Sequence, residues 1–252
     1  LLQNSLQRLT TGLRIISPSD DAAGLGQSVK INNEMKRIGG VLTVLGNVGS
    51  FVDSQVDFLS DVATSLSRMR ELTVSNQSSS TTASQRSANQ AEFRQLQQFI
   101  SDIGNRSFNN IALFNGVDLR GLKDEDGGTF TVNGVNYTTT FGGGGLFDVY
   151  QTTLDITATA GAITAQASVS TASANLTALQ GRANGSARVI DLYEGALTDL
   201  SENLQAVRDR ILNVDATSEN EEFSRVSLLT QTGTTLIAQY NLLRQNLLTL
   251  FE

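Results

Sequence analysis

The sequence predicts a mainly α protein, a long antiparallel coiled-coil-like helical bundle with a small β-rich insertion at its tip. Apolar residues recur with alternating steps of four and three over most of the chain, which places a narrow stripe on one face of a long helix and requires a partner helix. Polar or acidic segments interrupt this repeat. Between residues 115 and 181 it gives way to β-branched residues, aromatics and glycines.

The composition fits such a bundle and narrows the possible functions. Cysteine and histidine are both absent, which removes thiolate and imidazole nucleophiles, bases and metal ligands. We therefore expect no enzyme, no metal and no cofactor. The net charge of −7 leaves no basic face for a nucleic acid. No apolar run is long enough for a membrane span, so we expect no membrane insertion.

The first helical segment, residues 2–16, leads into the only proline of the chain. In "SPSDD" we expect Ser17 to be the N-cap of the next helix, with Pro18 at its first position. Asp20 and Asp21 would then lie near the positively polarised N-terminus of that helix. The proline is therefore predicted to mark a joint between two helical sections.

The stripe then resumes and is interrupted twice more. The segments that carry it are 41–69, 93–103, 193–214 and 226–250. Gln55 is a single polar position within it. The polar segment 75–85 predicts an exposed turn between two helices, and the acidic segment 213–222 predicts a second joint.

The middle of the chain has the features of a small β insertion. Residues 128–141 read "GTFTVNGVNYTTTF", in which Asn133-Gly134 is a strong signal for a hairpin turn. A glycine-rich loop, "FGGGGLF", follows at 141–147. Residues 152–170 alternate loosely, so they fit either a further strand or a return to helix.

Four stretches, taken in order, resemble signature segments of the bacterial flagellins. They are "QRLTTGLRIISPSDDAAGLGQS" (7–28), "LSRMRELTVSN" (66–76), "RSFNNIALFNG" (106–116) and "LLTQTGTTLIAQYNLLRQNLLTLFE" (228–252). Their order, and their presence at both ends, make the resemblance far more specific than any one motif.

The resemblance implies a division of the chain into three parts. These are inner-core terminal segments at 1–22 and 218–252, an outer-core helical domain at 23–117 and 181–217, and a variable β-rich surface insertion at 118–180. It also implies that residues which the family carries before Leu1 are missing here. We expect the 252 residues alone to be monomeric.

The function implied by the resemblance is that of a secreted, extracellular subunit that polymerises into the bacterial flagellar filament for motility. Its partners would be other flagellin subunits, an export chaperone and the filament cap. The terminal stripe would be buried against neighbouring subunits. Its predicted positions are Leu6, Leu9, Leu13, Val226, Leu229, Leu236, Tyr240, Leu243, Leu247 and Leu250.

Three further positions are singled out by the resemblance alone. Arg68, Leu72 and Glu92 fall where flagellins are bound by a vertebrate innate immune receptor. Arg68 and Leu72 are four residues apart and so share a helix face. The alternative is a solvated helix surface that takes part only in subunit packing.

Two other functions stay open. A hook–filament junction protein shares the terminal pattern, although "QTGTTLIAQ" at 231–239 favours a flagellin. A cell-surface adhesin or glycan-binding flagellin homologue would use the insertion. Catalysis is disfavoured, because the adjacent acidic residues have neither the geometry of a glycosidase pair nor the ligand spacing of an EF-hand.

Overall fold

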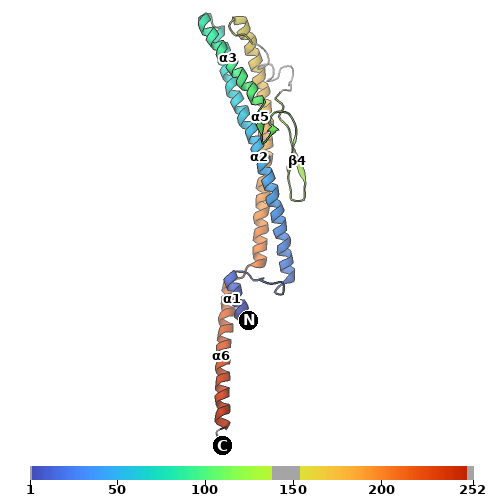
Figure 1. The fold of residues 1–252 in the computed structure, drawn as a ribbon, viewed down its shortest axis with the longest axis vertical. Helices are drawn as coiled ribbons and strands as arrows, with labels where there is room; N and C mark the ends of the chain where they lie inside the picture. Colours follow the sequence, from blue (N-terminus) through green and yellow to red (C-terminus); the bar gives the residue numbers. More distant parts are fainter. Residues whose placement is uncertain (1, 138–153, 249–252) are drawn as a thin grey trace. The chain divides into compact units, whose positions relative to one another are not determined.

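A computed structural model describes residues 2–137 and 154–248, and side chains up to residue 244 (Figure 1). The helices are α1 (Leu2–Thr11), α2 (Ala22–Gln77), α3 (Ala83–Gly104), α5 (Thr159–Leu212) and α6 (Ala216–Leu248), and the strands are β1 (Ser107–Phe108), β2 (Ile111–Ala112), β3 (Leu119–Leu122) and β4 (Thr129–Val132). The chain forms two compact units. We call Leu1–Arg37 with Asp199–Glu252 the terminal unit, and Ile38–Thr198 the central unit.

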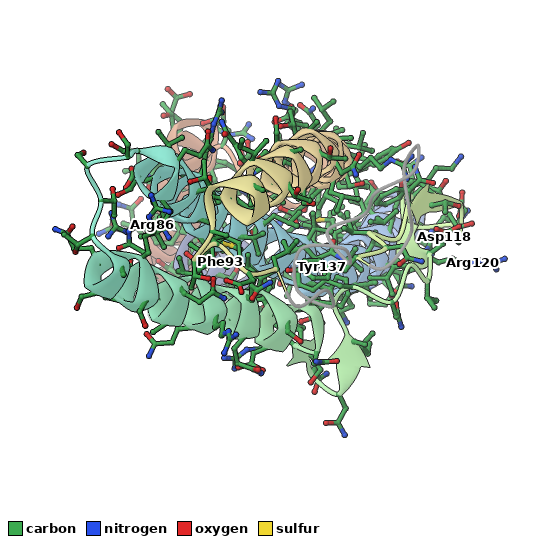
Figure 2. All side chains as sticks on the ribbon, turned by 90° about the horizontal axis from the view of Figure 1, so that it is seen from above. Arg86, Phe93, Asp118, Arg120 and Tyr137 are labelled. Atoms are coloured by element: carbon green, nitrogen blue, oxygen red, sulfur yellow. The ribbon has the colours of Figure 1, made fainter. Side chains whose placement is uncertain are left out.

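The core of the central unit is made by the predicted stripes of α2 and α3 together with α5. These three helices lie side by side (Figure 1), and Figure 2 shows Phe93 pointing from α3 in among them. The fully buried side chains on α2 and α3 include Leu45, Val52, Leu59, Val62, Met69, Phe93 and Ile100. The first part of α5 buries mostly alanines, and these small side chains allow the helices to approach closely.

Gln55, the polar position within the α2 stripe, is part of this core. Its side chain is buried, and its amide nitrogen donates to the backbone carbonyl of Leu113. A buried amide is tolerated when it has such a partner. The polar interruption therefore fixes the loop that follows β2.

The turn between α2 and α3 confirms the break predicted at 75–85. The Thr82 hydroxyl accepts the backbone N–H of Gln85 at 3.3 Å. The Gln85 side-chain oxygen in turn accepts the backbone N–H of Thr82 at 2.9 Å. This reciprocal capping box satisfies two N–H groups that the first turn of α3 leaves unpaired.

The predicted hairpin turn at Asn133-Gly134 is wrong. β4 pairs antiparallel with β3, which precedes it in the chain, and the turn is formed by residues 123–128. There the Asp124 carboxylate accepts the N–H groups of Asp126 and Gly128 at 3.2 and 2.6 Å. Gly127 adopts a positive φ of 89°, which glycine reaches without steric cost.

The β3–β4 hairpin lies beside the helices instead of beyond their end (Figure 1). The Phe130 and Tyr193 rings, from β4 and α5, are 4.8 Å apart. Residues 152–170, for which strand and helix were both open, are helical from Thr159 onward. The glycine-rich stretch at 141–147 lies outside the described residues.

The joint after α1 differs in detail from the prediction. α1 ends at Thr11, not near residue 16, and Gly12 follows with a φ of 71°. Pro18 is the second residue of a turn that is closed by the Asp20 N–H donating to the Ser17 carbonyl at 3.0 Å, a position that suits the fixed φ of proline.

The cap of α2 is therefore Asp21 and not Ser17. The Asp21 carboxylate accepts the backbone N–H of Gly24 at 2.8 Å. The second joint is also shorter than predicted, covering residues 213–215, because the carboxylate of Asp215 caps α6 by accepting the N–H of Thr217 at 2.9 Å. The acidic residues that follow lie in the first turns of α6, where the helix dipole favours negative charge.

Candidate functional site: the terminal helices

The two joints of the terminal unit are bound to each other through their backbones. Leu13 and Asn213 form an antiparallel bridge. The Arg14 N–H donates to the Leu212 carbonyl at 2.6 Å, and the Val214 N–H donates to the Gly12 carbonyl at 3.0 Å. Two segments about two hundred residues apart in sequence are thus held as a short two-stranded connection.

α1 packs against only the first turns of α6. The Ser5 hydroxyl is buried and donates to the Glu219 carboxylate. Arg8 lies 3.8 Å from a carboxylate oxygen of Glu219 and also 3.8 Å from one of Asp20. The Glu219 side chain is 11% exposed, so these contacts form a largely desolvated polar clasp between the two helices.

Beyond this clasp, α6 exposes a long apolar surface. Within the described residues no segment covers its apolar side chains, which remain 59–66% exposed. We call this surface the α6 apolar face. It consists of Leu228, Leu229, Leu236, Ile237, Tyr240, Leu242 and Leu243.

The structure places the predicted stripe residues in two groups. Leu9, Leu13 and Val226 are half-buried in the terminal unit, and Leu6 is exposed. The stripe residues of the α6 apolar face are exposed, and the side chains of Leu247 and Leu250 lie outside the described part of the chain. Their role in assembly stays a prediction.

Three residues of the α6 apolar face were not predicted from the stripe. Leu228, Ile237 and Leu242 lie beside it, on both of its flanks. They fall outside the four–three repeat, and only the apolar content around the stripe signals them. Because of them, exposed apolar side chains occupy more than one face of the helix, which is typical of a helix that is buried on several sides.

The expected receptor positions fall into an exposed pair and a buried residue. Arg68 on α2 donates to Glu92 on α3 at 2.6 Å and to Glu71 at 2.8 Å. The hydrogen bond from Arg68 lowers the pKa of Glu92 from its ordinary value. Leu72 is only 3% exposed, because the α2 stripe continues from Met69 by a further step of three.

Other kinds of site find little support in the described residues. Their acidic side chains nowhere gather in threes around a point that could hold a metal ion. None of the helices, as far as they are described, combines the length and apolar character needed to cross a membrane.

Models of two flagellin regions match the two ends of the chain. The bacterial flagellin N-terminal helical region matches residues 1–118, and the C-terminal helical region matches residues 162–251. The chain belongs to the flagellin family. This confirms the resemblance that the sequence motifs indicated.

Curated flagellins align with this flagellin over nearly its whole length. Flagellin FlaB2 of Treponema pallidum (strain Nichols) is 27% identical, over 100% of this chain and 92% of its own. The flagellin of Bacillus subtilis (strain 168) is 26% identical, over 99% of this chain and 92% of its own. The flagellin of Halalkalibacterium halodurans is 27% identical, over 95% of this chain and 88% of its own.

Among solved structures, a "putative flagellar hook-associated protein" from Vibrio parahaemolyticus superimposes with a TM-score of 0.63. It covers 77% of this chain and 100% of its own, at 17% identity. This likeness shows the fold alone, and it confirms the mainly helical class. The family matches favour a flagellin over a junction protein or an adhesin.

The protein is therefore a structural subunit of the bacterial flagellar filament and not an enzyme. It assembles with other flagellin subunits and is a component of the flagellum. These statements agree with the function, the enzyme class and the homopolymeric partner predicted from the sequence.

Proposed function

We propose that the α6 apolar face is the surface through which this flagellin joins its neighbours in the filament. The observation that carries the proposal is the 59–66% exposure of its side chains along a helix of which only the first turns are covered. Contiguous exposed apolar surface of this kind marks sites of association. A helix that is apolar on more than one flank suits a polymer in which several neighbours surround each subunit.

The energetics support this assignment. Burying an aliphatic side chain stabilises by about 1.5–3 kcal/mol, so the six aliphatic residues of the face could together contribute up to about 9–18 kcal/mol. Association costs about 4–15 kcal/mol in lost freedom. Burial of this face alone is therefore of the size that assembly needs.

The test is a pair of polar substitutions on the face, Leu236→Ser with Leu243→Ser, in cells whose only flagellin is the variant. We expect short or absent filaments by electron microscopy. The matched control is Leu192→Ser on α5, which is 73% exposed but lies outside the face. Filaments of normal length from the double variant would contradict the proposal.

We further propose the division of the chain that the sequence indicated, with inner-core segments at 1–22 and 218–252. Support comes from the two joints at 12–21 and 213–215, at which the helices end and restart. The remaining outer-core parts would be 23–117 and 181–217. The variable insertion would include the β3–β4 hairpin.

Export and capping are proposed on the same basis. A secreted subunit with an uncovered α6 apolar face would need an export chaperone over that face before assembly, since such surfaces aggregate. The filament cap would meet the same face at the growing end, outside the cell. Calorimetry would measure chaperone binding by the Leu236→Ser, Leu243→Ser variant, with Leu192→Ser as the control. Loss of binding in the double variant alone would support the proposal.

For the innate immune receptor we propose that the exposed Arg68–Glu92 pair forms the contact and that Leu72 supports it from beneath. The two charged side chains are 49% and 41% exposed. Arg68→Ala should weaken activation of receptor-bearing reporter cells, while Arg70→Ala, an exposed residue on α2, should not. Equal activation by both variants would leave subunit packing as the role of the pair.

A further inference from the structure

The chain contains three asparagines that are each followed by glycine, at Asn115, Asn133 and Asn184. In such a pair the backbone nitrogen of the glycine can attack the asparagine side-chain carbonyl, because no β-carbon hinders the approach. The reaction requires a side chain that is free to turn toward that nitrogen. The structure gives the three asparagines very different freedom.

Two of the three are held in place. Asn184 and the following glycine lie within α5, where the backbone is locked in helical geometry. The side-chain oxygen of Asn115 accepts the N–H of Val117 at 3.0 Å, which holds that side chain in one orientation. Both arrangements limit the rotation that the reaction requires.

Asn133 is exposed and directly follows the last residue of β4. The N–H of Gly134 donates to a carboxylate oxygen of Asp118 at 2.9 Å, and Figure 2 shows Asp118 at the outer edge of the molecule. A carboxylate that accepts this N–H polarises it, which increases the electron density on the nitrogen that must attack. Asn133 also lines an open groove of about 280 Å³ between β4 and α5, which gives water access.

Gly134 itself is required by the fold. A β-carbon at this position would overlap the backbone of Gly116 and Val117. The glycine that makes the pair reactive therefore cannot be replaced without displacing that loop.

We propose that Asn133 is a site of spontaneous backbone-assisted deamidation, and that Asp118 promotes it. The Gly134 nitrogen forms a bond to the Asn133 side-chain carbonyl carbon and loses its proton to solvent. The bond to the side-chain nitrogen breaks, and that nitrogen takes up a proton from solvent and leaves as ammonia. Water then opens the cyclic imide at either carbonyl, giving aspartate or isoaspartate with no oxidant or reductant.

The product changes the surface between β4 and α5. A carboxylate replaces a neutral amide in the groove that Arg182 also lines. The isoaspartate form inserts an extra methylene into the backbone between Val132 and Val135, both of which are buried. A subunit that stays in a long-lived filament would accumulate this change with age.

The test is incubation of the full chain in mildly alkaline buffer, followed by peptide mass spectrometry with isoaspartate detection. We expect the mass gain of an amide-to-acid conversion at Asn133, several-fold faster than at Asn115 or Asn184. Asp118→Asn should slow the conversion at Asn133 while leaving the other two rates unchanged. Asn133→Gln is the control, because its ring closure is much slower.

Two results would overturn the proposal. Conversion at Asn133 that is no faster than at Asn184 would contradict the assignment of Asn133 as a deamidation site. An unchanged rate in Asp118→Asn, with the fold intact by circular dichroism, would remove the role of Asp118. Neither measurement depends on filament assembly, so both outcomes are independent of the role of the α6 apolar face.

Discussion

Gln90 on α3 holds the backbone of Ile156 by accepting its N–H on the side-chain oxygen at 2.6 Å. The amide nitrogen of Gln90 donates to the Leu154 carbonyl at 3.0 Å, and Asn76 on α2 donates to the Ile156 carbonyl at 2.8 Å. Ile156 is fully buried. The side chains of Gln90 and Asn76 thus form hydrogen bonds with the backbone of residues 154–156, the segment that leads into α5. A neighbouring strand forms bonds of this kind in a sheet.

Gln90→Ala should destabilise the central unit. Two hydrogen bonds are lost, and the one to the Ile156 N–H is buried, so we expect the free energy of unfolding to fall by about 2–3 kcal/mol. Urea denaturation followed by circular dichroism measures this. The control is Gln98→Ala on the same helix, where the exposed amide donates to Asp102; there we expect a change within about 0.5 kcal/mol.

Leu59→Ala tests the core stripe of α2. Leu59 is fully buried, so truncation leaves a cavity and should cost about 2–5 kcal/mol. The same truncation at Leu192, which is 73% exposed, removes little buried surface and should leave the urea midpoint nearly unchanged. Equal effects at the two positions would mean that Leu59 is not in a close-packed core.

Glu219→Ala tests the polar clasp between α1 and α6. It removes the acceptor of the buried Ser5 hydroxyl and a carboxylate that lies near Arg8, so we expect α1 to lose about 1–2 kcal/mol of local stability. Amide hydrogen exchange in α1 measures the effect. Glu222→Ala, which removes an exposed pair with Arg225, should leave that exchange unchanged.

The two joints should weaken in acid. Backbone N–H groups of Ser17 and Ile16 hold the pKa of Asp20 below its ordinary value, and those of Thr217 and Ser218 do the same for Asp215. The unfolded chain therefore binds protons first as the pH falls. The stability from these bonds is present above the ordinary aspartate pKa and is lost as the pH falls through the lower folded values.

The measurement is amide exchange at the joints over a series of acidic pH values, corrected for intrinsic rates. Asp20→Asn with Asp215→Asn should flatten the pH dependence in the terminal unit. Asp53→Asn with Asp57→Asn, two exposed residues on α2, changes the charge equally and should not flatten it. A joint whose protection is independent of pH in the unmodified chain would contradict the prediction.

Much of the helical architecture follows from local pattern. The α2 stripe predicts burial at Leu45, Leu59 and Met69 correctly. A four–three repeat places its apolar residues on one helix face, and that face is buried whichever element packs on it. The β region was predicted less well. Asn133-Gly134 is a strong turn signal, yet the turn is formed by residues 123–128, where Asp124 and Gly127 supply its hydrogen bonds and its positive φ.

By itself, the sequence determined the family, the long helices, the joint at Pro18 and the stripe on α6, since each depends on residues close together in the chain. Only the tertiary structure decided which polar residues are buried, that Leu13 meets Asn213, and that α1 covers just the first turns of α6. Those outcomes depend on contacts between residues that are distant in the chain. The free energy of desolvating a polar group is set by such contacts and not by its neighbours in sequence.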